Sequence, residues 1–217
     1  MELKNKRVYF LGDSITQGVG ASSQENRYTD VFARNTGATV LNFGLSATRI
    51  ARQTKPSEWE QADRDFIMRS DEMPSEAPDV LVVFGGTNDF GHGDAPFGSF
   101  DDKTEYTFYG ALHILFRKLI EKYPTATIVI MTPLHRLSEN VRVNEFGIPC
   151  QPLSAYVAAE KEVAAYYSLP VLDLWSVAGM QPVIEAQQTG FMPDGLHPND
   201  AGARRIAERL QAFLTAL

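Results

Sequence analysis

The chain has 217 residues, of which 44% are hydrophobic and 22% charged, and this balance predicts one globular domain over residues 1–217 with a sizeable core. Its net charge of −7 and its scattered Lys and Arg residues argue against a nucleic-acid partner, because phosphate binding needs clustered positive charge. No apolar run reaches transmembrane length and no apolar signal segment precedes the first predicted strand, so we expect a cytoplasmic protein that does not insert into membranes.

Five short apolar runs occur along the chain, at residues 7–11, 39–43, 80–84, 127–131 and 170–174. Each run is continuous rather than alternating in polarity, which is typical of strands that are covered on both faces. Longer segments with apolar residues at helical spacing separate the runs, most clearly at residues 109–120, 155–167 and 201–214. This alternation predicts βαβ units, and therefore an α/β fold with a five-stranded parallel sheet.

Two long irregular stretches, residues 85–102 and 134–152, follow the third and fourth predicted strands. The carboxyl ends of parallel strands meet at one edge of a sheet, and ligands of open parallel sheets bind at that edge. Residues that directly follow a predicted strand are therefore the first candidates for a functional site.

A serine follows the first predicted strand, in Gly12-Asp13-Ser14. Near the C-terminus, Asp194-Gly195-Leu196-His197-Pro198 brings a carboxylate and an imidazole together in a loop before a helix. A Ser hydroxyl becomes a strong nucleophile only when a neutral imidazole removes its proton, and the imidazole needs a partner that fixes its tautomer. The sequence thus predicts a serine hydrolase in which Ser14 is the nucleophile, His197 the base and Asp194 the orienting acid.

Hydrogen-bond donors for a reacting carbonyl are predicted at the same edge. Gly44 ends the second predicted strand and Asn88 follows the third, in Gly85-Gly86-Thr87-Asn88-Asp89. Acyl transfer requires preorganised N–H donors at the oxyanion of the tetrahedral intermediate. We expect the backbone N–H groups of Ser14 and Gly44 and the side-chain amide of Asn88 to supply them.

Taken together, these segments resemble the SGNH hydrolases of the GDSL esterase and lipase family. The four sequence blocks of that family are matched in order by Gly12-Asp13-Ser14, Gly44, Gly86-Thr87-Asn88-Asp89 and Asp194-Gly195-Leu196-His197-Pro198. The resemblance implies a three-layer α/β/α sandwich similar to flavodoxin, with the same triad and oxyanion hole. One departure is Ala47, which stands where the family often has a further glycine, so the shape of that loop is not predicted.

Two other side chains near these blocks invite a catalytic interpretation. Asp13 adjoins the nucleophile, but its neighbouring position aims its side chain elsewhere, and we interpret it as stabilising the turn. Ser46 lies in Gly44-Leu45-Ser46-Ala47-Thr48, which lacks the final glycine of a Gly-x-Ser-x-Gly elbow, and we interpret it as a helix cap.

Substrate contacts are less defined by the sequence. The loops after the third and fourth strands are polar and charged and carry no long apolar lid, which favours a short acyl group on a polar alcohol such as an acetylated carbohydrate. Four residues near the active edge are candidate substrate contacts, each with an ordinary loop or surface role as its alternative: Arg49, His92, His135 and Arg136.

The predicted reaction is hydrolysis of a carboxylic ester through an acyl-enzyme, with a small-molecule ester as its partner and no metal or organic cofactor. A homo-oligomer is compatible with the sequence. A lipase, lysophospholipase or thioesterase of the same family is the alternative. A non-catalytic flavodoxin-like binding module is a remote one, because such a module needs no Ser14 or His197, and Asp13 would repel a bound phosphate.

Overall fold

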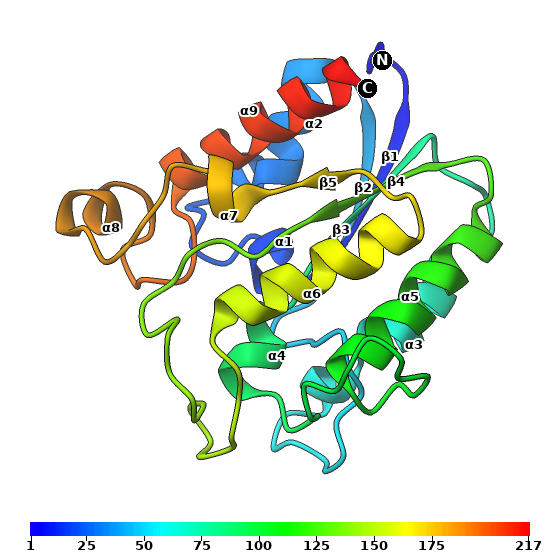
Figure 1. Cartoon of the computed structure of the whole chain (residues 1–217). Helices are drawn as coiled ribbons and strands as arrows, with labels where there is room; N and C mark the ends of the chain where they lie inside the picture. The colour runs from blue at the N-terminus through cyan, green and yellow to red at the C-terminus, as the bar shows by residue number, and fades with distance from the viewer.

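The structure is a computed structural model that describes residues 1–217 (Figure 1). Five strands form one parallel sheet in the order β2-β1-β3-β4-β5. Their bounds are β1 Arg7–Gly12, β2 Thr39–Gly44, β3 Val80–Phe84, β4 Thr127–Met131 and β5 Val171–Leu172. This order is that of flavodoxin-like doubly wound folds, in which the chain reverses direction across the sheet between β1 and β3. The predicted five-stranded parallel α/β fold is confirmed.

The helices connect the strands and cover both faces of the sheet (Figure 1). The α-helices are α1 Ser14–Gln17, α2 Tyr28–Thr36, α3 Phe66–Glu72, α4 Thr87–His92, α5 Phe108–Lys122, α6 Leu153–Tyr166, α7 Leu174–Val177, α8 Glu185–Phe191 and α9 Asp200–Ala216. Short 3₁₀ turns lie at Gln24–Asn26 and Glu60–Asp63. The predicted helices at 109–120, 155–167 and 201–214 correspond to α5, α6 and α9.

Two apolar cores lie on opposite faces of the sheet. Helices α3, α5 and α6 cover one face, and α2 and α9 cover the other (Figure 1). Side chains alternate along a strand, so Tyr9 and Leu11 of β1 enter the first core while Val8 and Phe10 enter the second. The cores contain 24 and 23 buried residues, and this near-equality explains why the strands are continuously apolar.

The two edge strands differ from the prediction. The fifth run, residues 170–174, pairs only at Val171–Leu172, because Asp173 directly precedes α7 and Leu174 belongs to that helix. Strand β2 was expected to be covered on both faces, yet Thr39 and Leu41 are exposed. An edge strand has a neighbour on one side only, and the helices of the first core do not extend over these residues.

The ends of the chain lie side by side, as Figure 1 shows. The amino group of Met1 donates to the carbonyl oxygens of Leu214 and Thr215 in α9, at 3.1 and 3.0 Å. None of the helices combines the length and the apolar composition that crossing a bilayer requires.

Candidate active site

Ser14 occupies the sharp turn between β1 and α1. Strand β1 ends at Gly12, and Ser14 is the first residue of α1. The carboxylate of Asp13 caps this helix by accepting a hydrogen bond from the N–H of Ile15 at 2.9 Å, which confirms the turn-stabilising interpretation of Asp13. The Ser14 residue is only 7% exposed, and its backbone N–H, at the first turn of a helix, has no acceptor within the helix.

The imidazole of His197 reaches Ser14 from the loop that precedes α9. Oγ of Ser14 lies 3.0 Å from Nε2 of His197, and Nδ1 of His197 lies 2.7 Å from Oδ2 of Asp194. The other carboxylate oxygen of Asp194 accepts from the backbone N–H groups of Leu196 and His197, at 2.9 and 2.7 Å. The three side chains therefore form one continuous chain of hydrogen bonds from a hydroxyl to a carboxylate.

The electrostatic setting of Asp194 suits a carboxylate that stays ionised. Partial burial raises its pKa, but the hydrogen bonds from the backbone N–H and the ring of His197 and from the N–H of Leu196 outweigh that effect, so that the pKa lies below its usual value. An ionised carboxylate at Nδ1 keeps the proton on that nitrogen, which leaves Nε2 free to accept the proton of a hydroxyl.

The loop after β2 contacts α1, the helix that begins with Ser14. The interpretation of Ser46 as a helix cap is wrong, since no helix begins between residues 45 and 51. Instead the backbone N–H and the hydroxyl of Ser46 both donate to Oε1 of Gln17, at 2.7 and 2.5 Å. Ser46 thus ties the loop to α1, the helix that carries Ser14.

Gly44 does not fit the role of an oxyanion donor. Its N–H donates to Oδ1 of Asn42 at 2.8 Å, so this N–H already has an acceptor. A Cβ at this position would lie 2.1 Å from the backbone nitrogen of Gln17. Glycine is therefore needed here because α1 packs directly against the end of β2, and not because a substrate carbonyl approaches.

Ala47 presents a free backbone donor in this loop. Its φ of 65° lies in the left-handed region, which favours glycine, and its N–H makes no hydrogen bond within the protein. Sequence reasoning missed this residue, although the signal was present in the frequent glycine of the family at position 47. A non-glycine residue held with positive φ, in a loop that Ser46 ties to the helix beginning at Ser14, is typical of a functional constraint.

Asn88 lies in the first turn of α4 and is buried. Its Nδ2 donates to the carbonyl oxygen of Thr48 at 3.0 Å, so that the amide is held next to Ala47. The second N–H of the same amide nitrogen has no acceptor within the protein. The predicted proximity of Asn88 to the loop after β2 is therefore present, with Ala47 rather than Gly44 as its neighbour.

A buried carboxylate fastens the same loop from the other side. Asp89 accepts from the backbone N–H groups of Ile50 and Ala51, at 2.9 and 2.8 Å. Burial raises the pKa of Asp89 to about 6, against the opposing effect of these two hydrogen bonds. Asn88 and Asp89 thus both hold residues 48–51 in place, Asn88 at Thr48 and Asp89 at Ile50 and Ala51.

The two arginines proposed as substrate contacts are buried. Arg49 is 3% exposed and donates to the ring and the carbonyl oxygen of His92. The guanidinium of Arg136 lies 5.5 Å from the ring centroid of Phe90 and donates to the carboxylate of Glu145. The prediction for Arg49 is corrected, because its guanidinium is enclosed by acceptors of the protein and fastens α4 to the loop after β2. Arg136 also fastens α4, through the carbonyl oxygen of Thr87, but it lines the larger cavity described below, so its role as a substrate contact stays a prediction.

The two histidines also have protein partners. His92 was expected in a loop, but it is the last residue of α4, and its Nε2 lies 3.0 Å from Oδ1 of Asn88. His135 does lie in a loop, where its Nδ1 is 2.9 Å from Oε2 of Glu139 and its ring lies 3.7 Å from that of Trp175. Neither ring forms a hydrogen bond with the Ser14–His197–Asp194 chain.

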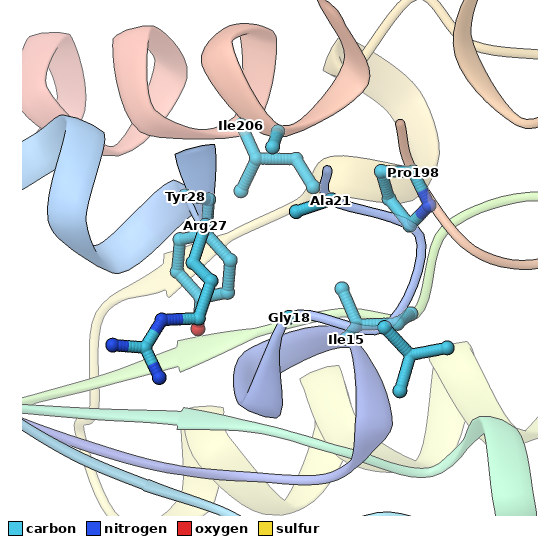
Figure 2. A pocket seen from close by; sticks show the side chains of 9 residues that line it. Ile15, Gly18, Ala21, Arg27, Tyr28, Pro198 and Ile206 are labelled. Carbon is cyan, nitrogen blue, oxygen red and sulfur yellow. The ribbon is translucent and has the colours of Figure 1, made fainter. Parts of the chain in front are cut away.

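Two cavities lie near the hydrogen-bonded residues Ser14, His197 and Asp194. Figure 2 shows the smaller one, where Ile15 and Pro198, the residues that follow Ser14 and His197, line a gap beneath Ile206. Its volume of about 10 Å³ could hold at most one water molecule. It therefore belongs to the packing between α1 and α9.

The larger cavity, of about 380 Å³, is lined by residues 136–141 together with Gln181 and Val183. The backbone N–H of Leu137 donates to the carbonyl oxygen of Gly195 at 2.9 Å. Gly195 lies between Asp194 and His197, so this cavity opens beside the loop that carries the imidazole. The cavity has the size of a small-molecule site.

The sequence profile of the GDSL-like Lipase/Acylhydrolase family matches residues 10–205. Among curated proteins, the chain is 26% identical to an acetylxylan esterase of Xylanibacter ruminicola over 222 aligned positions, covering 96% of this chain. The chain spans only 43% of the length of that relative.

Solved structures share the fold over nearly the whole chain. A protein from Lactobacillus plantarum is 34% identical with a TM-score of 0.82, over 99% of this chain and 98% of its own. A lipase/acylhydrolase from Enterococcus faecalis is 19% identical with a TM-score of 0.60, over 97% and 96%. A two-domain esterase active on acetylated mannans is 24% identical with a TM-score of 0.59, over 97% of this chain and 49% of its own.

Proposed function

The chain belongs to the GDSL-like lipase/acylhydrolase family, and from this premise we propose that it hydrolyses short-chain carboxylic esters, acetylated carbohydrates first among them, with Ser14 as nucleophile. The observation that carries the proposal is the hydrogen-bond chain from Oγ of Ser14 through both ring nitrogens of His197 to Asp194. A neutral imidazole with this geometry can accept the hydroxyl proton as the oxygen attacks.

In the proposed first step, Oγ of Ser14 bonds to the ester carbonyl carbon while its proton moves to Nε2 of His197. Asp194 stabilises the imidazolium that results. As the tetrahedral intermediate collapses, His197 returns the proton to the departing alcohol oxygen. The acyl group is then bound to Ser14 as an ester.

In the second step, His197 removes a proton from water, and the water oxygen attacks the acyl-serine carbonyl carbon. Collapse of this second intermediate protonates Oγ and releases the carboxylic acid. Protons and bonds balance over the cycle with water as the only co-substrate.

We assign the oxyanion hole to three N–H donors around Ser14. They are the backbone N–H groups of Ser14 and Ala47 and the free N–H of the Asn88 amide. The hydrogen bond from Asn88 to the carbonyl of Thr48 supports this assignment, since it holds the amide next to Ala47. Preorganised donors of this kind stabilise the negative charge that develops on the carbonyl oxygen.

The larger cavity receives the alcohol part of the ester in this proposal. The side chains of Ser138 and Asn140 line it and have no partners within the protein, and Leu137 and Val141 supply apolar contacts. Hydroxyl and amide groups beside small apolar patches suit a carbohydrate better than a long acyl chain. The acetylxylan esterase relative is consistent with an acetyl ester.

Acetate release from acetylated xylo-oligosaccharides tests the function directly. The wild-type protein should release acetate, and Ser14→Ala at the same concentration should not. Long-chain lysophospholipids serve as the competing substrates. Preferential release of fatty acid from these lipids would replace the carbohydrate esterase with the lipase alternative.

A further inference from the structure

The amide of Asn88 belongs to a closed ring of hydrogen bonds. Its Nδ2 donates to the carbonyl oxygen of Thr48, and its Oδ1 faces Nε2 of His92, each at 3.0 Å. Nδ1 of His92 in turn faces Nη2 of Arg49 at 2.7 Å. Arg49 follows Thr48 in the chain, so the ring closes through one peptide unit.

The donors and acceptors in this ring fix the protonation of His92. An amide oxygen can only accept and a guanidinium can only donate. Nε2 of His92 must therefore carry the proton that it donates to Oδ1 of Asn88, while Nδ1 must keep its lone pair to accept from Arg49. The contacts select the neutral Nε2–H tautomer.

The surroundings of the ring oppose protonation of His92. Burial lowers its pKa to about 4, and the positive charges of Arg49 and Arg136 act in the same direction. Arg49 cannot turn away, since it also donates to the carbonyl oxygens of Ala62 and His92 at 3.3 and 3.1 Å. The nearest carboxylate to Arg49, that of Asp63, lies 3.9 Å from its Nη1. The ring of Phe146 lies 6.0 Å from that of His92 and carries no charge.

We propose that His92 is a positioning residue that, together with Arg49, locks the Asn88 amide with its free N–H directed at the oxyanion. A rotated amide would place Oδ1 against the carbonyl oxygen of Thr48 and Nδ2 against the N–H of His92. Both contacts would be repulsive, so the ring permits only one orientation. The inference rests on the proposed function, because it gives the Asn88 amide an oxyanion to bind.

Two substitutions separate this role from simple packing. His92→Phe keeps an aromatic ring but loses both ring nitrogens, whereas His92→Gln offers an amide N–H to Asn88 and an amide oxygen to Arg49. For an acetyl ester, His92→Phe should lower kcat by about 10- to 100-fold, less than the complete loss of a donor, with KM nearly unchanged. His92→Gln should recover most of kcat.

A double-substitution cycle shows whether His92 acts through Asn88. In an Asn88→Ala background there is no amide to orient, so adding His92→Phe should leave kcat unchanged. A further fall by the same factor as in the wild-type background would overturn the inference, because His92 would then support activity by another path. Melting temperatures of all four proteins, measured in parallel, show that each is folded at the assay temperature.

The tautomer provides a readout that does not depend on activity. Nitrogen NMR of protein with ¹⁵N-labelled histidine should show His92 as the Nε2–H form, without titration between pH 5 and 8. A protonated Nδ1, or titration near the ordinary histidine pKa of about 6.5, would overturn the inference whatever the activity. Absence of ester hydrolysis by the wild-type protein would instead overturn the proposed function.

Discussion

Oγ of Ser14 lies 3.0 Å from Nε2 of His197, although 183 positions of sequence separate the two residues. The first follows β1 at the start of α1, and the second precedes α9. Helix α9 packs against α2 in the second core, alongside the N-terminal end of the chain. Ser14 and His197 are thus held by elements that fold together at one face of the sheet.

Substitutions at Asn88 and Gly44 should affect different properties, catalysis at Asn88 and stability at Gly44. Asn88→Ala removes one preorganised donor, so kcat should fall by about 10²- to 10³-fold with little change in KM. Gly44→Ala places a Cβ 2.1 Å from the nitrogen of Gln17, so it should destabilise the fold by about 1–3 kcal/mol as overpacking does. Kinetics on an acetyl ester and thermal unfolding of both variants check this. A folded Asn88→Ala protein with wild-type kcat would remove Asn88 from the mechanism.

The backbone donor can be tested by changing one atom. Incorporating lactic acid at position 47 replaces the N–H of Ala47 by an ester oxygen and keeps the methyl group. We expect kcat to fall by about 10²- to 10³-fold, as for loss of one oxyanion donor. Glycolic acid at position 44 is the matched control, and it should lower stability while leaving kcat of the folded protein near that of the wild type. The reverse pattern would restore Gly44 as the donor.

Three buried acidic side chains should make the free energy of unfolding depend on pH. Burial raises the pKa of Asp13 to about 7 and that of Asp89 to about 6, and raises that of Glu160 well above its usual value. The folded protein therefore retains protons that the unfolded chain has already released above a pH of about 4. These three acids should therefore lower the free energy of unfolding as pH rises from about 4 to about 7. His92, whose pKa burial lowers to about 4, has the opposite sign and offsets part of this decrease below a pH of about 6.5.

Glu160→Gln isolates the contribution of one of these acids. Glu160 is 1% exposed, and neither of its carboxylate oxygens has a hydrogen-bond partner, so its ionised form is strongly disfavoured. The amide keeps the size of the side chain and cannot ionise. The variant should melt at a higher temperature than the wild type at pH 8 and at a similar temperature at pH 4. An unchanged difference between the two pH values would contradict the assignment.

The acyl length that the enzyme accepts should be set by the loops after β3 and β4, which carry no long apolar lid. Without a long apolar cover, each added methylene should contribute far less than the roughly 0.8 kcal/mol of full burial. Acetyl and butyryl esters of p-nitrophenol should therefore give higher kcat/KM than decanoyl esters. A maximum at eight or ten carbons would favour a lipase or lysophospholipase.

The sequence allowed the central sheet and the contact between Ser14 and His197 to be predicted, because both follow from local patterns. Continuous apolar runs mark strands covered on both faces, and residues after such strands meet at one edge. The edge strand β2 and the two-residue β5 were less predictable, since their coverage depends on neighbours distant in the sequence.

The contacts of the residues that surround Ser14, His197 and Asp194 could not be predicted in the same way. Arg49 was predicted to contact substrate or to lie on the surface, because charged residues are mostly exposed, yet it is buried among acceptors from other segments. The oxyanion donor was assigned to Gly44 and not to Ala47, because the close approach of α1 to Gly44 and the positive φ of Ala47 are properties of the folded backbone. A sequence gives residue identities, but it does not give the backbone angles and the contacts between distant segments on which these roles depend.

Covalent labelling tests the central claim, that Ser14 is the nucleophile, most directly. The protein is incubated with a fluorophosphonate, and the modified peptide is identified by mass spectrometry. We predict stoichiometric label on Ser14 and loss of ester hydrolysis in proportion to it, with Ser14→Ala unlabelled. Label on another serine such as Ser46, or full hydrolytic activity in the unlabelled Ser14→Ala protein, would contradict the assignment.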